Sequence, residues 1–311
     1  MGKYPIDKEL VKLRNLHLPN GLGVFMRTDR ESDMSENIKQ KTVLSCWIIF
    51  AILIFVHGFE AIVLRMDETV LGENCINKLF GIFAVFVVLR LINWKWEDIG
   101  FAKNGFSKGI CIGLILGISS FLISYTIEIL MLRNQGLKAH LGVFTTGFSL
   151  TGEASVHTGI GFILMCVFFN VINVIMEEGT FRGLFYKIVD MDHSMRFALL
   201  FQAFLFGIWH IVTPLHNLID GDINTASFVA LGVGYIILAG MMGIKWGLLY
   251  RMTGNLYAGM ADHFFNNCIA TNLLHVITDT GTDDMMIVRV IIAQLLSFAV
   301  VIAVWLKRKY A

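Results

Sequence analysis

Long apolar stretches alternate with short polar segments along the chain from about residue 43 to its end. A helix needs ~17–25 predominantly apolar residues to cross the hydrocarbon core of a bilayer. All of these stretches except 79–93 reach that length. They lie at 43–64, 79–93, 109–132, 158–180, 197–213, 226–244, 255–275 and 286–306. The pattern therefore predicts about eight transmembrane helices.

Composition supports a membrane protein. Of the 311 residues, 56% are hydrophobic and 16% are charged, whereas a soluble domain usually carries about 25% charged residues. The predicted fold class is therefore all-α, a polytopic helical bundle in the membrane. We expect residues 1–41, which are polar, to form a cytoplasmic N-terminal arm, and residues 42–311 to form one transmembrane domain.

The distribution of positive charge predicts the orientation. Lys and Arg concentrate on the cytoplasmic side of membrane proteins, and 20 of the 25 in this chain fall in alternate connections and at both ends. Those segments are 1–41, 90–108, 182–196, 245–251 and 307–311. Both termini are thus predicted to be cytoplasmic, and the expected location is the plasma membrane of a bacterial or archaeal cell, with no nucleic-acid partner.

Several ionisable and amide side chains lie within the apolar stretches. Glu177, Glu178 and Arg182 are on the fourth predicted helix, His210 is on the fifth, and the seventh carries His263 and Asn267. A charged group in the bilayer core costs on the order of 2.5 kcal/mol or more, so such groups are functional candidates by default.

Helical spacing separates these groups into faces. Residues four apart share a face, so Glu178 and Arg182 can form an ion pair while Glu177 points elsewhere, about 100° around the helix. His263 and Asn267 also share a face. At about 1.5 Å per residue, the candidates on all three helices lie roughly 20 Å from charged residues at their predicted cytoplasmic ends, so they can meet at one depth.

The combination resembles the CAAX protease and bacteriocin-processing family of intramembrane endopeptidases. The resemblance is carried by the order and spacing of Glu177-Glu178-Gly-Thr-Phe-Arg182, Phe206-x-x-x-His210 and His263-x-x-x-Asn267, and it covers about residues 158–275.

The resemblance implies hydrolysis of a peptide bond by a water molecule activated between Glu177 and His210. His263 and Asn267 would donate hydrogen bonds to the developing oxyanion, and Glu178 with Arg182 would give structural support. No metal or other cofactor is implied. The expected partners are the lipid bilayer and a membrane-associated substrate, such as a lipidated protein or an amphipathic peptide.

Other interpretations remain open at this level. Glu177, His210 and His263 are also acceptable zinc ligands, which leaves a zinc-dependent protease as an alternative. A scaffold for bacteriocin immunity or regulation could carry the same residues without cleaving a peptide. A proton-coupled transporter is disfavoured, because the chain shows neither internal halves nor paired broken helices.

The remaining candidates have structural explanations. Gly109, Gly113 and Gly117 recur on one face of the third helix, which predicts close approach of a neighbouring helix. Asp262 and Asn266 lie beside the seventh-helix pair on another face, and we expect them to be packing or hydration groups. The five cysteines have no metal or redox spacing.

Overall fold

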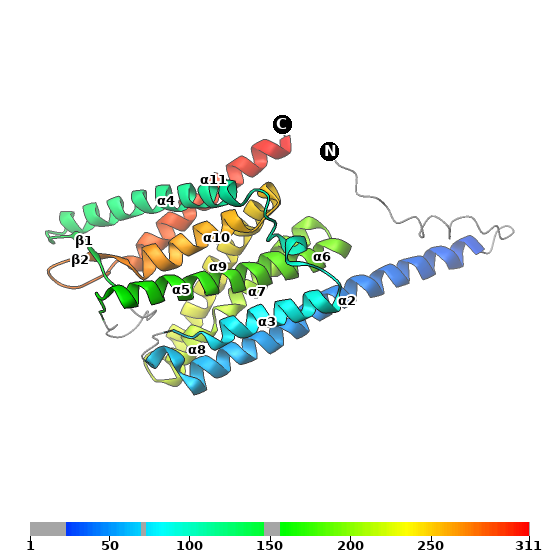
Figure 1. Ribbon diagram of the computed structural model, residues 1–311, viewed down its shortest axis with the longest axis horizontal. Helices are drawn as coiled ribbons and strands as arrows, with labels where there is room; N and C mark the ends of the chain where they lie inside the picture. Colours follow the sequence, from blue (N-terminus) through cyan, green and yellow to red (C-terminus); the bar gives the residue numbers. More distant parts are fainter. Residues whose placement is uncertain (1–22, 70–72, 146–155, 311) are drawn as a thin grey trace.

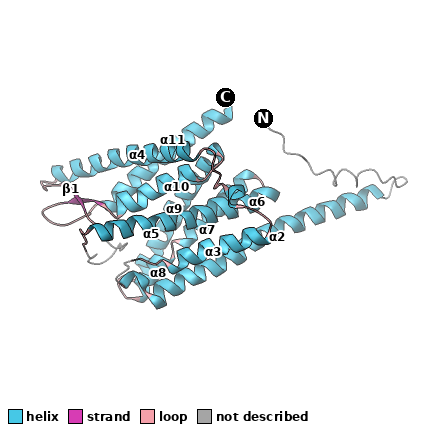
Figure 2. Cartoon of the chain, viewed as in Figure 1, coloured by secondary structure: helices cyan, strands magenta, loops and turns pink. Residues whose placement is uncertain are grey.

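The computed structural model describes residues 23–69, 73–145 and 156–310 of the chain. It is a helical bundle with one small two-stranded sheet, which confirms the predicted all-α membrane fold (Figures 1 and 2). The helices are α2 (Gly23–Phe59), η2 (Glu60–Leu64), η3 (Met66–Glu68), α3 (Ile76–Leu91), η4 (Trp96–Ile99), α4 (Phe106–Asn134), α5 (Ile160–Glu177), η5 (Glu178–Phe185), α6 (Tyr186–Asp192), α7 (Met195–Trp209), α8 (Val212–Ile219), α9 (Thr225–Thr253), α10 (Tyr257–Phe264), η6 (Phe265–Thr271) and α11 (Met286–Tyr310). The strands are β1 (His140–Val143) and β2 (Leu274–Ile277), paired antiparallel.

Within the described residues, six helical segments are long and apolar enough to cross a membrane. They are Lys41–Leu64, Phe106–Asn134, Ile160–Asp192, Met195–Ile219, Thr225–Thr253 and Met286–Lys309. The other two predicted spans correspond to shorter elements, α3 with 16 residues and the α10–η6 unit. The long helices lie side by side, with the β1–β2 sheet and α8 at one end of the bundle and α6 and the chain's C-terminus at the other (Figure 1).

Three predicted boundaries were wrong. The fifth helix was expected to run to residue 213, but α7 ends at Trp209 and α8 starts at Val212, because Pro214 clashes with a carbonyl four residues before it in a continuous helix. The sixth was expected to end at 244, yet α9 continues to Thr253 and ends before Gly254, whose φ of 74° is the left-handed conformation glycine tolerates. The seventh ends at Thr271, and β2 follows.

The start of the first membrane helix also differs from the expected boundary. Helix α2 begins at Gly23, so residues 23–41 of the predicted cytoplasmic arm continue the first apolar segment as helix. Residues 1–22 of the arm lie outside the described residues. Residues 146–155, which lie between the third and fourth predicted helices, also lie outside them.

Close packing of α4 against α10 follows from the predicted glycine face. A Cβ atom at Gly113 would lie 2.2 Å from the carbonyl oxygen of Ala258, and one at Gly109 would lie 2.8 Å from Cβ of Tyr257. At Gly117 the nearest atom would be Cβ of Phe265, at 3.1 Å. The glycine face therefore lets the backbone of α10 rest directly on α4.

A buried ionic network fixes the end of the bundle that carries the sheet. Arg289 binds Glu128 at 2.7 Å and Asp283 at 3.0 Å, and Asp283 also binds Nδ1 of His275 at 2.6 Å. Burial opposes ionisation of Asp283, but the hydrogen bond from His275 and the charge of Arg289 lower the pKa of its carboxyl group. The network joins α4, β2 and α11 and was not predicted from the sequence.

Replacing Gly113 with alanine should loosen the bundle, because the added methyl group meets the backbone of α10. Overpacking of this kind typically costs about 1–3 kcal/mol, so we expect Gly113→Ala to lower the melting temperature of the purified protein in detergent. The matched control is Gly234→Ala, on the exposed side of α9, where a Cβ atom meets nothing within 4 Å. Equal melting temperatures for the two variants would contradict the close α4–α10 contact.

Candidate functional site

Five of the six candidate residues lie where two α-helices change into π-helices. Glu177 is the last residue of α5, and Glu178 begins the π-helical segment η5, which also contains Arg182. His263 lies on α10, and Asn267 lies on the π-helical segment η6. Short π-helical segments inserted into α-helices occur frequently at functional sites. Here each π-helical segment contains part of one predicted motif.

Glu177 is 5% exposed, and its two carboxylate oxygens have different surroundings. Oε1 accepts a hydrogen bond of 3.1 Å from the indole nitrogen of Trp209. Oε2 is buried without a hydrogen-bond partner among the described residues, and it lies 3.4 Å from Nε2 of His263. One oxygen is thus held in place, while the other is turned toward the histidine.

His263 lies between the two glutamates. Its Nδ1 is 2.9 Å from Oε1 of Glu178, and its Nε2 is 3.1 Å from Nδ2 of Asn267. In the neutral imidazole, Nδ1–H donates to Glu178 and Nε2 accepts from Asn267. In the imidazolium, Nε2–H is a second donor beside the Asn267 amide, directed toward Glu177.

Arg182 is fully buried and contacts the site through charge and aromatic faces. Its Nη1 is 3.4 Å from Oε1 of Glu178, so the predicted ion pair is present. The guanidinium carbon lies 3.8 Å from the ring centroid of Phe206 and 4.8 Å from that of Trp246. A desolvated cation over aromatic faces gains about 2 kcal/mol or more. Arg182 thus balances the carboxylates and ties η5 to α7 and α9.

His210 caps the end of α7 and is partly exposed. Its Nδ1 is 2.8 Å from the carbonyl oxygen of Phe206. In the neutral imidazole, Nδ1–H donates to that carbonyl, and Nε2 is then the acceptor. The ring of Phe206 contacts His210 and His263, with centroid distances of 4.6 and 6.2 Å. His210 is linked to Glu177 through its neighbour Trp209, whereas His263 contacts both Glu177 and Asn267 directly.

The role of Lys245 was not predicted from the sequence. It was assigned to a cytoplasmic connection, but it is 1% exposed on α9 and binds Asp262 at 2.6 Å. Asp262 also accepts a hydrogen bond of 2.7 Å from the indole nitrogen of Trp246, whose ring stacks on His263 at 4.0 Å. Asp262 is therefore a counter-ion, where a packing or hydration group was expected. Apolar residues continue through Leu248 and Leu249, and that signal could have extended the predicted helix.

Potential metal ligands gather elsewhere. Among the described residues, one group of three ligand atoms lies within 4.8 Å of one another, from Glu68, His216 and Asp220. Arg65 forms ion pairs with Glu68 and Asp220 and supplies the positive charge there. The set proposed for zinc in the alternative interpretation does not form such a group.

Comparison with known proteins agrees with the resemblance seen in the sequence. Residues 159–269 match the family model described as type II CAAX prenyl endopeptidase, Rce1-like. This match confirms the resemblance for that segment, which includes every predicted site residue, and supports a CAAX-type intramembrane protease in general terms. None of the curated proteins matches the chain.

The buried pair of Lys245 and Asp262 gives a stability prediction. Removing one partner of a buried ion pair typically costs about 3–5 kcal/mol, whereas replacing both is often nearly neutral. We therefore expect Lys245→Met to lower the melting temperature in detergent strongly, and Lys245→Met/Asp262→Asn to recover much of the loss. If the double variant is no more stable than the single one, the two residues are not mutual counter-ions.

Proposed function

We propose that the protein is a membrane-embedded endopeptidase that hydrolyses a peptide bond with a water molecule activated by Glu177 and His210. The observation that carries the proposal is the Oε2 atom of Glu177, a buried carboxylate oxygen without a hydrogen-bond partner among the described residues. It lies 3.4 Å from Nε2 of His263, which in turn contacts the Asn267 amide, and these two groups can donate to an oxyanion. A base and oxyanion donors are what amide hydrolysis requires.

In the proposed reaction, Glu177 accepts a proton from water while the water oxygen attacks the carbonyl carbon of the substrate. The carbonyl π bond breaks, and its electron pair forms the oxyanion of a tetrahedral intermediate. Collapse of the intermediate re-forms the carbonyl and breaks the C–N bond. The leaving amine takes the proton held by Glu177, and a carboxylic acid and an amine are released. Nε2 of His210, free of the helix backbone, is assigned to orient the water.

Stabilisation of the oxyanion is assigned to His263 and Asn267. Their Nε2 and Nδ2 atoms are 3.1 Å apart, so one oxygen can accept hydrogen bonds from both when Nε2 is protonated. Glu178 supports this state, because its carboxylate holds Nδ1 at 2.9 Å and stabilises a charged imidazole. Arg182, 3.4 Å from Oε1 of Glu178, holds this carboxyl group in place. Glu178 and Arg182 thus act through His263, without touching the substrate.

The substrate we propose is a peptide that reaches the site from the membrane, either lipidated or amphipathic. Two features support this: the site lies within apolar helices, and the segment 159–269 matches a CAAX prenyl endopeptidase family. A plasma-membrane location with both termini in the cytoplasm remains our expectation from the distribution of Lys and Arg.

Glu177→Gln should abolish most of the activity while leaving the fold intact, because the amide keeps the shape of the side chain but cannot accept the proton. General-base catalysis contributes typically 10²–10⁴-fold, so we expect turnover of a lipidated or amphipathic peptide to fall by at least ~10² in purified protein. Glu178→Gln should also lower the yield of folded protein, because Arg182 and His263 lose their partner. A well-folded, inactive Glu178→Gln beside an active Glu177→Gln would reverse the two roles.

Asn267→Ala should lower turnover with little change in peptide binding. Loss of one oxyanion donor typically costs about 10²–10³ in turnover, and the donor is needed only once negative charge has formed.

The wild type should also keep its activity after dialysis against a strong chelator. Activity that is lost on chelation and restored by stoichiometric zinc, together with a normal Asn267→Ala variant, would instead favour the zinc-dependent alternative. Binding of the peptide without cleavage would favour the scaffold.

A further inference from the structure

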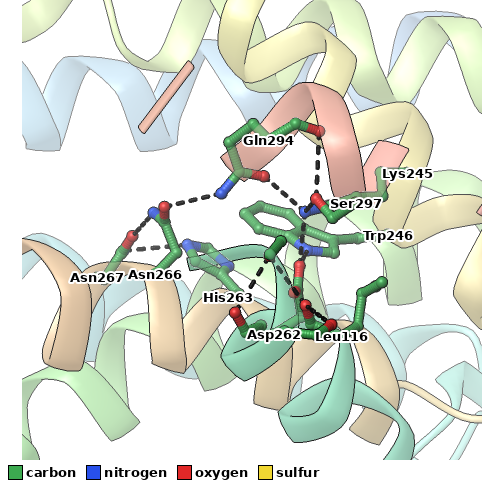
Figure 3. Close-up of polar contacts among 12 residues, drawn as sticks. Leu116, Lys245, Trp246, Asp262, His263, Asn266, Asn267, Gln294 and Ser297 are labelled. Atoms are coloured by element: carbon green, nitrogen blue, oxygen red, sulfur yellow. Dashed lines mark hydrogen bonds and ion pairs between the residues drawn. The ribbon is translucent and has the colours of Figure 1, made fainter. Parts of the chain in front are cut away.

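A line of polar side chains leads from a buried lysine to the Asn267 amide (Figure 3). Nζ of Lys245 donates to Oε1 of Gln294 at 2.5 Å, and Nε2 of Gln294 donates to Oδ1 of Asn266 at 2.8 Å. Nδ2 of Asn266 donates to Oδ1 of Asn267 at 2.7 Å. Nδ2 of Asn267 then faces Nε2 of His263. We call Lys245, Gln294, Asn266 and Asn267 the amide relay.

The chemistry of the lysine sets the direction of the amide relay. An ammonium group has three donors and no acceptor, so the oxygen of Gln294 must face it. The amino group of Gln294 is then left for Asn266, and each later amide is oriented in turn. The remaining two donors of Lys245 are used by Asp262 and Ser297, at 2.6 and 2.9 Å. Lys245 therefore acts only as a hydrogen-bond donor, and the direction of the amide relay cannot reverse.

Burial makes this orientation energetically significant. Lys245 and Gln294 are each 1% exposed and Asn266 is 6% exposed, so a reversed amide would leave donors or acceptors unpaired in a low dielectric. Hydrogen bonds in one direction also polarise one another, by about 10–30% per bond. The positive charge of Lys245 at the start of the amide relay therefore strengthens the Asn267 amino group as a donor at its end.

We infer that the amide relay orients and polarises the Asn267 amino group as an oxyanion donor, with Lys245, Gln294 and Asn266 as positioning residues. The inference rests on the proposed function of Asn267. It assigns a role in the site to α11, because Gln294 lies beyond residues 159–269, the segment that matches the family model. The last helix of the bundle thereby determines which atom of Asn267 faces the reacting carbonyl group.

Gln294→Glu tests the direction of the amide relay. Beside Lys245 the new carboxylate is ionised and can only accept, so Asn266 must turn its amino group toward it. Asn267 then turns in the same sense and presents its oxygen to the site, where an oxyanion is repelled. Because losing one oxyanion donor costs about 10²–10³ in turnover, we expect kcat to fall at least ~10-fold, with KM nearly unchanged.

Ser297→Ala is the matched control. It removes another hydrogen bond of the same lysine, on the same helix, but outside the amide relay, so kcat should stay at the wild-type value. Gln294→Met is the second variant should the carboxylate prevent folding. It keeps the length of the side chain, breaks the series of hydrogen bonds and should also lower kcat, by less than Gln294→Glu does.

A double-mutant cycle separates positioning from general damage to the fold. In an Asn267→Ala background the amide relay has nothing to orient, so adding Gln294→Glu should cause no further loss of kcat. Equal losses of kcat in both backgrounds would overturn the inference, as would a folded Gln294→Glu variant with wild-type kcat.

A measurement without substrate distinguishes failure of the amide relay from failure of the proposed function. In protein labelled with ¹⁵N-asparagine, the side-chain amide signals of Asn267 are identified by their loss in Asn267→Ala. They should shift in Gln294→Glu and stay in place in Ser297→Ala. Unshifted signals overturn the amide relay even when the wild type cleaves peptides. Shifted signals uphold its orienting role even if no peptide is cleaved and the proposed function fails.

Discussion

The low dielectric inside the bundle is the constraint on which the site depends. A charge there must be balanced by another charge or held by hydrogen bonds, because water is not available to solvate it. Arg182 meets this requirement with Glu178 and two aromatic faces, and Lys245 meets it with Asp262 and two neutral acceptors. The contacts of Arg182 and those of Lys245 both join helices that are distant in the sequence. The charges that serve the site therefore also hold the bundle in register.

Close helix packing and the π-helical segments determine where these charges meet. The glycine face of α4 lets α10 approach to backbone contact, which fixes the helix that carries Asp262 and His263. Segment η5 follows Glu177 directly, and η6 begins two residues after His263. A π-helical turn alters the directions in which side chains project, and this allows two glutamates that are adjacent in the sequence to approach the two ring nitrogens of one histidine.

The sequence predicted the membrane fold, the glycine contact and the ion pair of Glu178 with Arg182, because each depends on local spacing or on composition. It did not predict that Glu178 also binds His263, because that contact depends on how α10 packs against η5. The burial of Lys245 was missed for a related reason. A lysine near the predicted end of a helix resembles a residue at the membrane surface, and only its contact with Asp262, 17 positions later, places it inside the bundle.

The contacts of His263 connect the folded bundle to the proposed chemistry. Nδ1 is held at 2.9 Å by Glu178, which Arg182 contacts in turn, and Nε2 lies 3.1 Å from the Asn267 amide and 3.4 Å from Oε2 of Glu177. An imidazole held at Nδ1 cannot rotate its other ring nitrogen away from these two neighbours. The contacts that satisfy buried polar groups in the folded bundle therefore also set the position of this nitrogen relative to the proposed base and the proposed amide donor.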